Sequence, residues 1–185
     1  QKMAQLLGRE HHVLDFRETF QQYVISNFVD EYASGRTPNP CVMCNSHIKW
    51  GKLMQAAEEY DCDYIATGHY AKIVRENNDV VLMRSADLKK DQSYFLHGLK
   101  KEQLKRAIFP LEGADKEYVR KIAEECGFDN AAQKDSQDIC FIPDGNYKKF
   151  LEEKSDFYNS NKEIMTPYAK ITDVSDYVKI SVKKK

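Results

Sequence analysis

The sequence has little net charge and no long apolar run. Lys and Arg number 28 and Asp and Glu 29, so the formal net charge is −1 and the overall charge does not point to a nucleic-acid partner. Such a partner has to be argued from small local basic clusters, which on most proteins are solvated helix faces. No apolar stretch approaches the roughly 18 residues needed to span a bilayer, and no signal-peptide pattern opens the chain. We therefore expect no membrane partner.

The cysteines are too few for a disulfide framework, and their number is odd. Five occur in 185 residues, which favours a reducing compartment, such as the cytoplasm, with thiols kept for redox, ligand or core roles. A hydrophobic content of 42% is enough for one domain with a core, or one domain with a small appendage. The chain starts at Gln1 and already inside a helical pattern, so we expect a piece of a longer protein.

Strand patterns alternate with helical patterns, which predicts an α/β fold with a parallel sheet. After residue 85 the pattern becomes mostly helical. Strands are predicted at 12–16, 64–67, 71–75 and 80–84, and weakly at 168–172 and 177–182. Helices are predicted at about 3–7, 20–32, 45–60, 91–98, 101–109, 115–126 and 147–153, the sixth of them capped by Asp115. The helix 45–60 presents a predicted buried stripe of Trp50, Leu53, Met54 and Ala57.

Two cysteines stand in settings that present a thiol. Pro38 and Pro40 each restrict the residue before them, so residues 37–41 are predicted to be non-helical and the next helix to begin near Asn45. Cys44 then lies at the N-terminal end of that helix, where the macrodipole and free N–H groups stabilise a thiolate. Cys140 follows an acidic, hydroxyl-rich turn and precedes an apolar pair, which predicts a junction between loop and core.

The other cysteine patterns have plainer readings. Cys126 on an apolar helix face and Cys62 at the entry to a strand are predicted core residues. Cys41 and Cys44 form a CxxC, which alone is half a zinc site or a redox pair. No second CxxC exists, and His47 could reach a shared metal, but no fourth ligand is identifiable. A two-thiol site without metal is therefore the favoured interpretation.

Gly68 and His69 stand at the C-terminal end of a predicted parallel strand. Ligands of open α/β sheets bind at such ends. Gly68 allows close approach of a nucleotide to the backbone, and His69 offers a hydrogen-bond donor. A lone histidine at a strand end is more often structural, so this pair is a candidate ligand site only in combination with other residues.

With these pieces assembled, the sequence resembles the tRNA-specific 2-thiouridylases from about residue 1 to 154. Four runs carry the resemblance, in the family's order and approximate spacing. They are Gly35 to Pro40 with Cys44, Asn45, Ile48 and Lys49; Asp63 to Tyr70; Lys90 to Leu96; and Asp135 and Ser136 with Ile139 to Ile142.

The resemblance implies a PP-loop ATPase fold of Rossmann-like type at 1–142, incomplete at its N-terminus, followed at 143–185 by the start of a central domain and a divergent tail. It implies a tRNA sulfurtransferase in which ATP, with Mg²⁺, activates C2 of the wobble uridine. Cys140 matches the persulfide-carrying cysteine, and Cys44 matches the second catalytic cysteine, which leaves a Cys44–Cys140 disulfide. The sulfur comes from a cysteine desulfurase or a sulfur-carrier protein.

The same resemblance assigns the binding residues. Gly68 matches an ATP contact of the family, and His69 matches a tRNA contact. The remaining matches are Asn39, Pro40 and Cys41 to the contact with the target base, and Lys90, Asp91 and Gln92 to a segment that touches tRNA.

The sequence departs from the family at three places. The Ser-Gly-Gly-x-Asp-Ser phosphate loop is absent and is expected upstream of Gln1, so the chain alone is expected not to turn over. The family's C-terminal β-barrel is missing after about Ser155. Cys41 occupies a variable position, so Cys41, Cys44 and Cys140 form an alternative ligand set for a [4Fe–4S] cluster. A remnant that binds tRNA or a partner without chemistry is the other alternative.

Overall fold

The computed structural model describes residues 2–77, 79–128 and 139–154. It divides into two compact units, Gln1–Ile25 with Asn39–Ser136 and Ser26–Pro38 with Gln137–Lys185. The two weak strands predicted at 168–172 and 177–182 lie outside the described residues. None of the helices in the described ranges is long and apolar enough to cross a membrane.

The first unit opens with helix α1, Lys2–Leu6, which ends as predicted at Gly8 in the left-handed conformation (φ +61). The predicted strand 12–16 is wrong, because these residues run as extended chain without strand pairing and Val13 is 85% exposed. Alternating residues form a strand only where a neighbour takes their backbone hydrogen bonds, and the described residues supply none there. The predicted helix from Phe20 follows as α2, Arg17–Phe20, and the π-helical η1, Gln21–Ile25.

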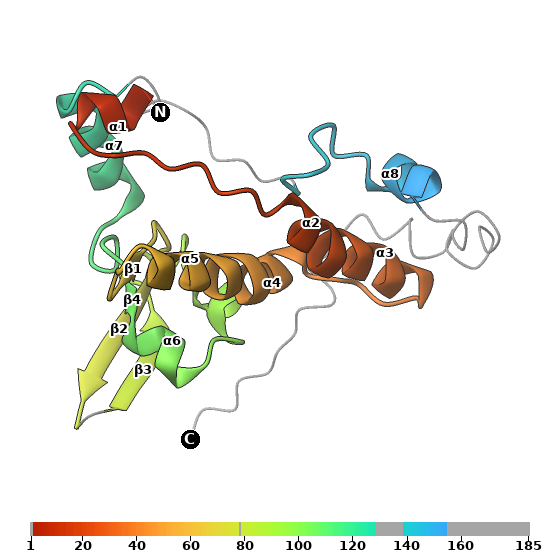
Figure 1. Ribbon diagram of the computed structural model, residues 1–185, viewed down its shortest axis with the longest axis horizontal. Helices are drawn as coiled ribbons and strands as arrows, with labels where there is room; N and C mark the ends of the chain where they lie inside the picture. The colour runs from red at the N-terminus through yellow and green to blue at the C-terminus, as the bar shows by residue number, and fades with distance from the viewer. Residues whose placement is uncertain (1, 78, 129–138, 155–185) are drawn as a thin grey trace. The chain divides into compact units, whose positions relative to one another are not determined.

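One continuous helix forms the centre of the first unit (Figure 1). It comprises α4, Pro40–Cys44; the π-helical η2, Asn45–Lys52; and α5, Leu53–Glu59. The predicted start near Asn45 is wrong by five residues, because Pro40 takes the first helical position, where its missing N–H costs nothing. Asn39 is the N-cap, and its Oδ1 accepts a hydrogen bond from the Val42 N–H at 3.3 Å.

The predicted stripe of this helix is confirmed as the centre of the core. Trp50 is fully buried, Met54 and Ala57 are buried, and Leu53 packs against them. The Trp50 and Phe109 rings form a T-shaped pair with 6.0 Å between centroids. The buried residues of this core are Trp50, Met54, Ala57, Ile65, Ala71, Ile73, Val80, Leu96, Leu99, Leu104, Ala107 and Phe109.

The parallel sheet predicted from the sequence is present as a two-stranded pair. Strand β1, Ile65–Ala66, pairs in parallel with β4, Ala107–Ile108, which confirms the α/β class. The prediction of helix throughout 101–109 is wrong, since α6 covers only Lys101–Lys105 before the chain enters β4. The Ile65 N–H donates to the Arg106 carbonyl at 2.8 Å, so pairing with β1 overrides the helical pattern.

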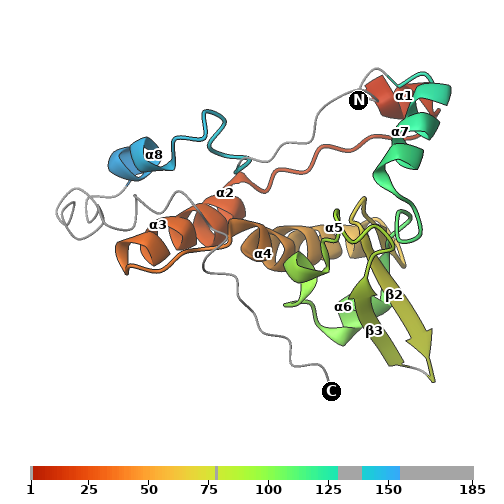
Figure 2. The same cartoon turned by 180° about the vertical axis from the view of Figure 1, so that it is seen from behind.

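The predicted hairpin is confirmed. Strand β2, Ala71–Glu76, pairs antiparallel with β3, Asp79–Arg84, and α6 lies beside β3 in both views (Figure 2). The predicted helix 91–98 is reduced to a 3-10 turn, η3, Ser93–Leu96.

Helix α7, Lys116–Glu125, is capped as predicted, since Asp115 Oδ1 accepts the Tyr118 N–H at 2.7 Å. However, α7 buries none of its residues, and Cys126 after it is exposed. Cys62 is also exposed, so the prediction that both cysteines are core residues is wrong. An apolar face on a helix does not say whether a neighbour covers it.

The described part of the second unit is built around aromatic residues of two helices, α3, Ser26–Ala33, and α8, Tyr147–Lys154. The predicted helix 147–153 is thereby confirmed. Phe28, Ile142 and Leu151 are buried at the centre. The Phe28 ring meets the Phe141 ring edge-on at 5.4 Å between centroids, which ties the segment after Cys140 to α3.

Candidate functional site

A pocket of about 410 Å³ opens in the first unit where β1 ends. It brings together residues from the central helix, from the segment after β1 and from the turn before η3. The lining residues are Lys49, Leu53, Thr67, Gly68, His69 and Gln92. Three of them, Gly68, His69 and Gln92, are site residues that the resemblance assigned from two separate motifs.

His69 is buried in the wall of this pocket, with both ring nitrogens engaged. Its Nε2 lies 3.3 Å from the Lys49 Nζ, and its Nδ1 lies 2.7 Å from the Thr67 Oγ1. An ammonium group can only donate, so Nε2 accepts and Nδ1 carries the proton that it donates to Thr67. The ring also packs on Phe109, 5.9 Å between centroids and tilted by 74°. The imidazole is therefore fixed in one tautomer and orientation.

Burial, and then the neighbouring Lys49 charge, lower the pKa of His69 from 6.5 to about 4. His69 is accordingly neutral at neutral pH, and Lys49 supplies the positive charge of the pocket. The sequence placed Lys49 near Cys44 in the chain but gave no sign of its contact with His69, because twenty residues separate the two. Thr67 is only two residues from His69, but it was predicted as the last residue of a strand, so its contact with the ring was missed.

The backbone at Gly68 is accessible. A Cβ added there meets only the Leu111 Cδ1, at 3.9 Å, which is ordinary van der Waals contact. Packing therefore does not require a glycine at this position, and a ligand can approach the main chain. Gln92 is bonded to the segment that follows Gly68. Its side-chain Oε1 accepts the Tyr70 N–H at 3.1 Å, and its main-chain N–H donates to the Tyr70 carbonyl at 2.8 Å.

The three residues 90–92, which are predicted to contact tRNA, each have different neighbours. The Asp91 carboxylate accepts the Ser85 N–H at 2.8 Å and the Ser93 hydroxyl at 2.7 Å, so it fastens the loop between them. Gln92 lines the His69 pocket, whereas Lys90 lines a second, larger cavity of about 740 Å³. Asp91 thus holds the loop from which Lys90 and Gln92 project.

The residues predicted to contact the target base form the start of the central helix. Asn39 is its cap, Pro40 its first residue and Cys41 its second. Cys41 is exposed, and its carbonyl accepts a hydrogen bond from the Asn45 Nδ2 at 2.9 Å. Cys44 is half-buried and is the fifth helical residue, so its predicted place at the helix N-terminus is wrong.

His47 stacks on Tyr23, with ring centroids 4.4 Å apart and planes 9° from parallel. Within 2–77, 79–128 and 139–154, no three His, Cys, Asp or Glu side chains are grouped so that they could hold a metal ion. His47 therefore makes an aromatic contact in this structure and is not grouped with Cys41 and Cys44 as a metal ligand.

Cys140 belongs to the second unit. Its side chain is exposed, while Phe141 and Ile142 after it pack in the aromatic core, as the junction predicted from the sequence requires. The thiol is thus held next to an anchored segment and open to solvent.

Comparison with known proteins identifies relatives over most of the chain. The family described as tRNA methyl transferase HUP domain matches residues 1–144. A protein of Salinibacter ruber described as tRNA-specific 2-thiouridylase MnmA is 53% identical over 152 residues, which cover 80% of this chain and 40% of that protein. Proteins with the same description from Amoebophilus asiaticus and Cytophaga hutchinsonii are 50% and 47% identical, over 83% of this chain and 41% and 42% of theirs. The chain thus spans about two fifths of the length of these relatives.

Proposed function

The chain belongs to the tRNA methyl transferase HUP domain family, and from that premise we propose that it is part of a tRNA 2-thiouridylase. The observation that carries the proposal is the pocket at the end of β1, where Gly68, His69 and Gln92 line one cavity together with the Lys49 cation. A nucleotide needs an approachable backbone and a positive charge for its phosphates, and both are present there.

The reaction consumes ATP and proceeds in three steps, which a reduction of the protein follows. The C2 oxygen of the wobble uridine takes the AMP group of ATP, and pyrophosphate leaves. The terminal sulfur of a Cys140 persulfide then bonds to C2, and the bond between C2 and its oxygen breaks as AMP departs. The Cys44 thiolate attacks the Cys140 sulfur, the electron pair of the broken S–S bond stays on the sulfur at C2, and a thiol reductant later opens the Cys44–Cys140 disulfide.

Each residue of the pocket has a distinct role in this proposal. Lys49 pairs with phosphate oxygens, and Gly68 presents main chain to the nucleotide. His69, neutral and with its ring nitrogens bonded to Lys49 and Thr67, contacts the RNA through the ring without adding charge. Asn39, Pro40 and Cys41 receive the target base at the first turn of the helix that carries Cys44. Lys90 and Gln92 contact the tRNA, and Asp91 acts through the loop it fastens.

The metal ion, the sulfur donor and the cellular compartment are part of the same proposal. Mg²⁺ accompanies ATP, the sulfur donor is a cysteine desulfurase or a carrier protein, and the protein works in the cytoplasm, where tRNA and reduced thiols occur together. The alternative with a [4Fe–4S] cluster on Cys41, Cys44 and Cys140 predicts iron and acid-labile sulfide in anaerobically purified protein. Absorbance near 400 nm that disappears in Cys41→Ser would favour the cluster over the two-thiol mechanism.

The test is thiolation of tRNA by the complete protein with ATP and a persulfide donor, read as 2-thiouridine by mass spectrometry of nucleosides. Cys44→Ser and Cys140→Ser are expected to abolish product. The matched controls are Cys62→Ser and Cys126→Ser, which remove other exposed thiols and should leave the product yield unchanged. No 2-thiouridine from the wild type, together with tRNA binding that is unchanged in Cys44→Ser and Cys140→Ser, would instead support the alternative of a tRNA-binding or partner-binding remnant.

A further inference from the structure

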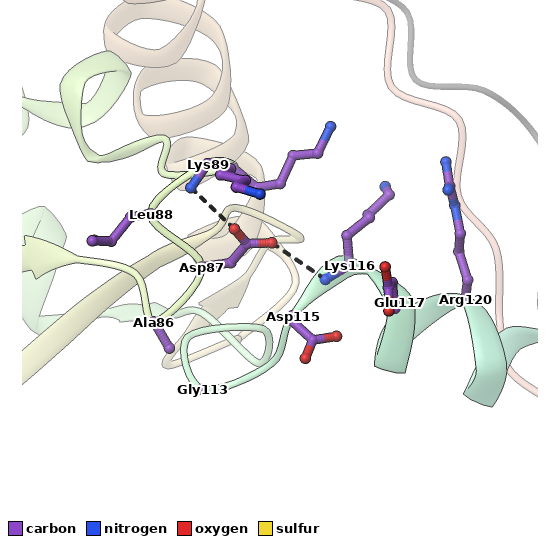
Figure 3. Close-up of a pocket in the computed structure, with 10 residues that line it drawn as sticks. Ala86, Asp87, Leu88, Lys89, Gly113, Asp115, Lys116, Glu117 and Arg120 are labelled. Atoms are coloured by element: carbon purple, nitrogen blue, oxygen red, sulfur yellow. Dashed lines mark hydrogen bonds between the residues drawn. The ribbon is translucent and has the colours of Figure 1, made fainter.

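A second cavity of the first unit, of about 740 Å³, is lined by four cationic side chains from two segments. Lys89 and Lys90 come from the turn after β3, and Lys116 and Arg120 come from α7. Figure 3 shows Lys116 and Arg120 extending from the same side of the helix, as residues four apart should. Lys116 and Arg120 belong to none of the motifs that the sequence singled out.

Most of the acidic residues that line this cavity accept hydrogen bonds from backbone N–H groups. Asp87 accepts the Lys89 N–H at 3.0 Å through one oxygen and the Lys116 N–H at 3.4 Å through the other, so it joins the turn to α7. Asp115 caps α7 through the Tyr118 N–H. Glu117 is the third carboxylate in the lining. Two of the three carboxylates are therefore committed to backbone donors, while the four cations line the cavity.

Arg120 adds an independent sign of a ligand. Its Nε is buried and has no hydrogen-bond partner among the described residues. A buried donor without an acceptor costs free energy, and an anionic oxygen that binds the guanidinium can relieve that cost. Arg also presents a planar fork that matches phosphate oxygens.

The cavity is linked to the His69 pocket through contacts of Tyr70. Lys116 Nζ lies 5.7 Å from the centre of the Tyr70 ring, and Tyr70 in turn exchanges two hydrogen bonds with Gln92, which lines the His69 pocket. The turn from Lys89 to Gln92 thus has one end in each cavity. RNA that His69 and Gln92 contact at the first pocket is therefore next to the cationic side chains of the second.

We infer that Lys116 and Arg120, with Lys89, bind the phosphate backbone of the tRNA next to the part of it that His69 and Gln92 contact. This inference rests on the proposed function for the identity of the RNA. Phosphate contacts by Lys and Arg position a nucleic acid without reading its sequence, and each one adds about 0.7 to 0.9 to the steepness of the salt dependence of binding.

The experiment measures binding of a fluorescently labelled tRNA with a wobble uridine to the complete protein by anisotropy, at several salt concentrations. Lys116→Gln and Arg120→Gln should each lower affinity about fivefold to tenfold at 0.1 M salt and flatten the salt slope by roughly 1. Lys121→Gln is the matched control, since it removes the same charge from the same helix at a side chain that is 72% exposed and pairs with Glu125. It should change neither quantity.

Lys116→Arg keeps the charge and should retain wild-type binding, which separates loss of a phosphate contact from loss of folding. Unchanged slopes in Lys116→Gln and Arg120→Gln, or an equal loss in Lys121→Gln, would overturn the inference. Lost ATP affinity with intact tRNA affinity would overturn it as well and assign the cavity to nucleotide phosphates. Normal tRNA binding by the wild type without thiolated product would refute the proposed function and leave this inference standing.

Discussion

Protonation of His69 is expected to destabilise the fold in mildly acidic solution. Burial and the Lys49 charge lower the pKa of His69 from 6.5 to about 4 in the folded chain. Between these two values the unfolded chain binds a proton that the folded chain does not, so stability rises with pH and is lost as pH falls from about 6.5 to about 4. The loss is about 2 kcal/mol by pH 5 and on the order of 3 kcal/mol once both states are protonated.

Urea unfolding at several pH values measures this effect. With a denaturant slope of about 2 kcal/mol per molar, the wild-type midpoint should fall by about 1 M between pH 8 and pH 5 through His69 alone. Carboxylates titrate in every variant, so the comparison is with His69→Gln, whose stability should fall less over the same range. Parallel pH profiles of wild type and His69→Gln would refute the assignment of a buried, neutral imidazole.

The Lys49→Met variant tests what lowers the pKa of His69. Burial is the larger cause of the low pKa, so removing the ammonium should raise the pKa of His69 only part of the way back to 6.5. The midpoint is measured directly by NMR titration of the His69 ring. A return to 6.5 in Lys49→Met would show that the charge, and not burial, dominates.

Three further substitutions test the packing, the cap and the pocket. Trp50→Ala should cost about 3 to 5 kcal/mol of unfolding free energy, because the side chain is fully buried at the centre of the core. Asn39→Ala should cost about 1 kcal/mol through loss of the bond to the Val42 N–H, measured by urea unfolding. Gly68→Ala should change stability by less than about 0.5 kcal/mol, since its Cβ meets only Leu111 at 3.9 Å, yet lower ATP-dependent thiolation.

Features set by short-range physics could be predicted from the sequence. The stripe from Trp50 to Ala57 follows from helical periodicity, and the cap at Asp115 follows from the side-chain chemistry of the residue. The hairpin follows from two β-rich runs around a polar turn, where Asn77 adopts a positive φ of 49°. In each case, neighbours within a few residues decide the conformation.

Features decided by distant partners could not be predicted. Strand β4 forms because β1 offers hydrogen bonds more than forty residues earlier, although 101–109 has a helical pattern. Residues 12–16 have a strand pattern but remain unpaired as a strand. The contact between Lys49 and His69 joins the central helix to the end of β1, and no local signal announces it.

The start of the central helix changes the physical argument for the two cysteines near it. The helix begins at Pro40, so Cys41 is its second residue and Cys44 its fifth. The macrodipole and the free N–H groups act mainly within the first turn, so they favour a thiolate at Cys41 more than at Cys44. The nucleophilic role proposed for Cys44 therefore cannot rest on the helix terminus. In the proposed reaction it rests on the persulfide, whose S–S bond is broken readily by any thiolate held in reach, and on the half-buried position that keeps Cys44 from competing thiols.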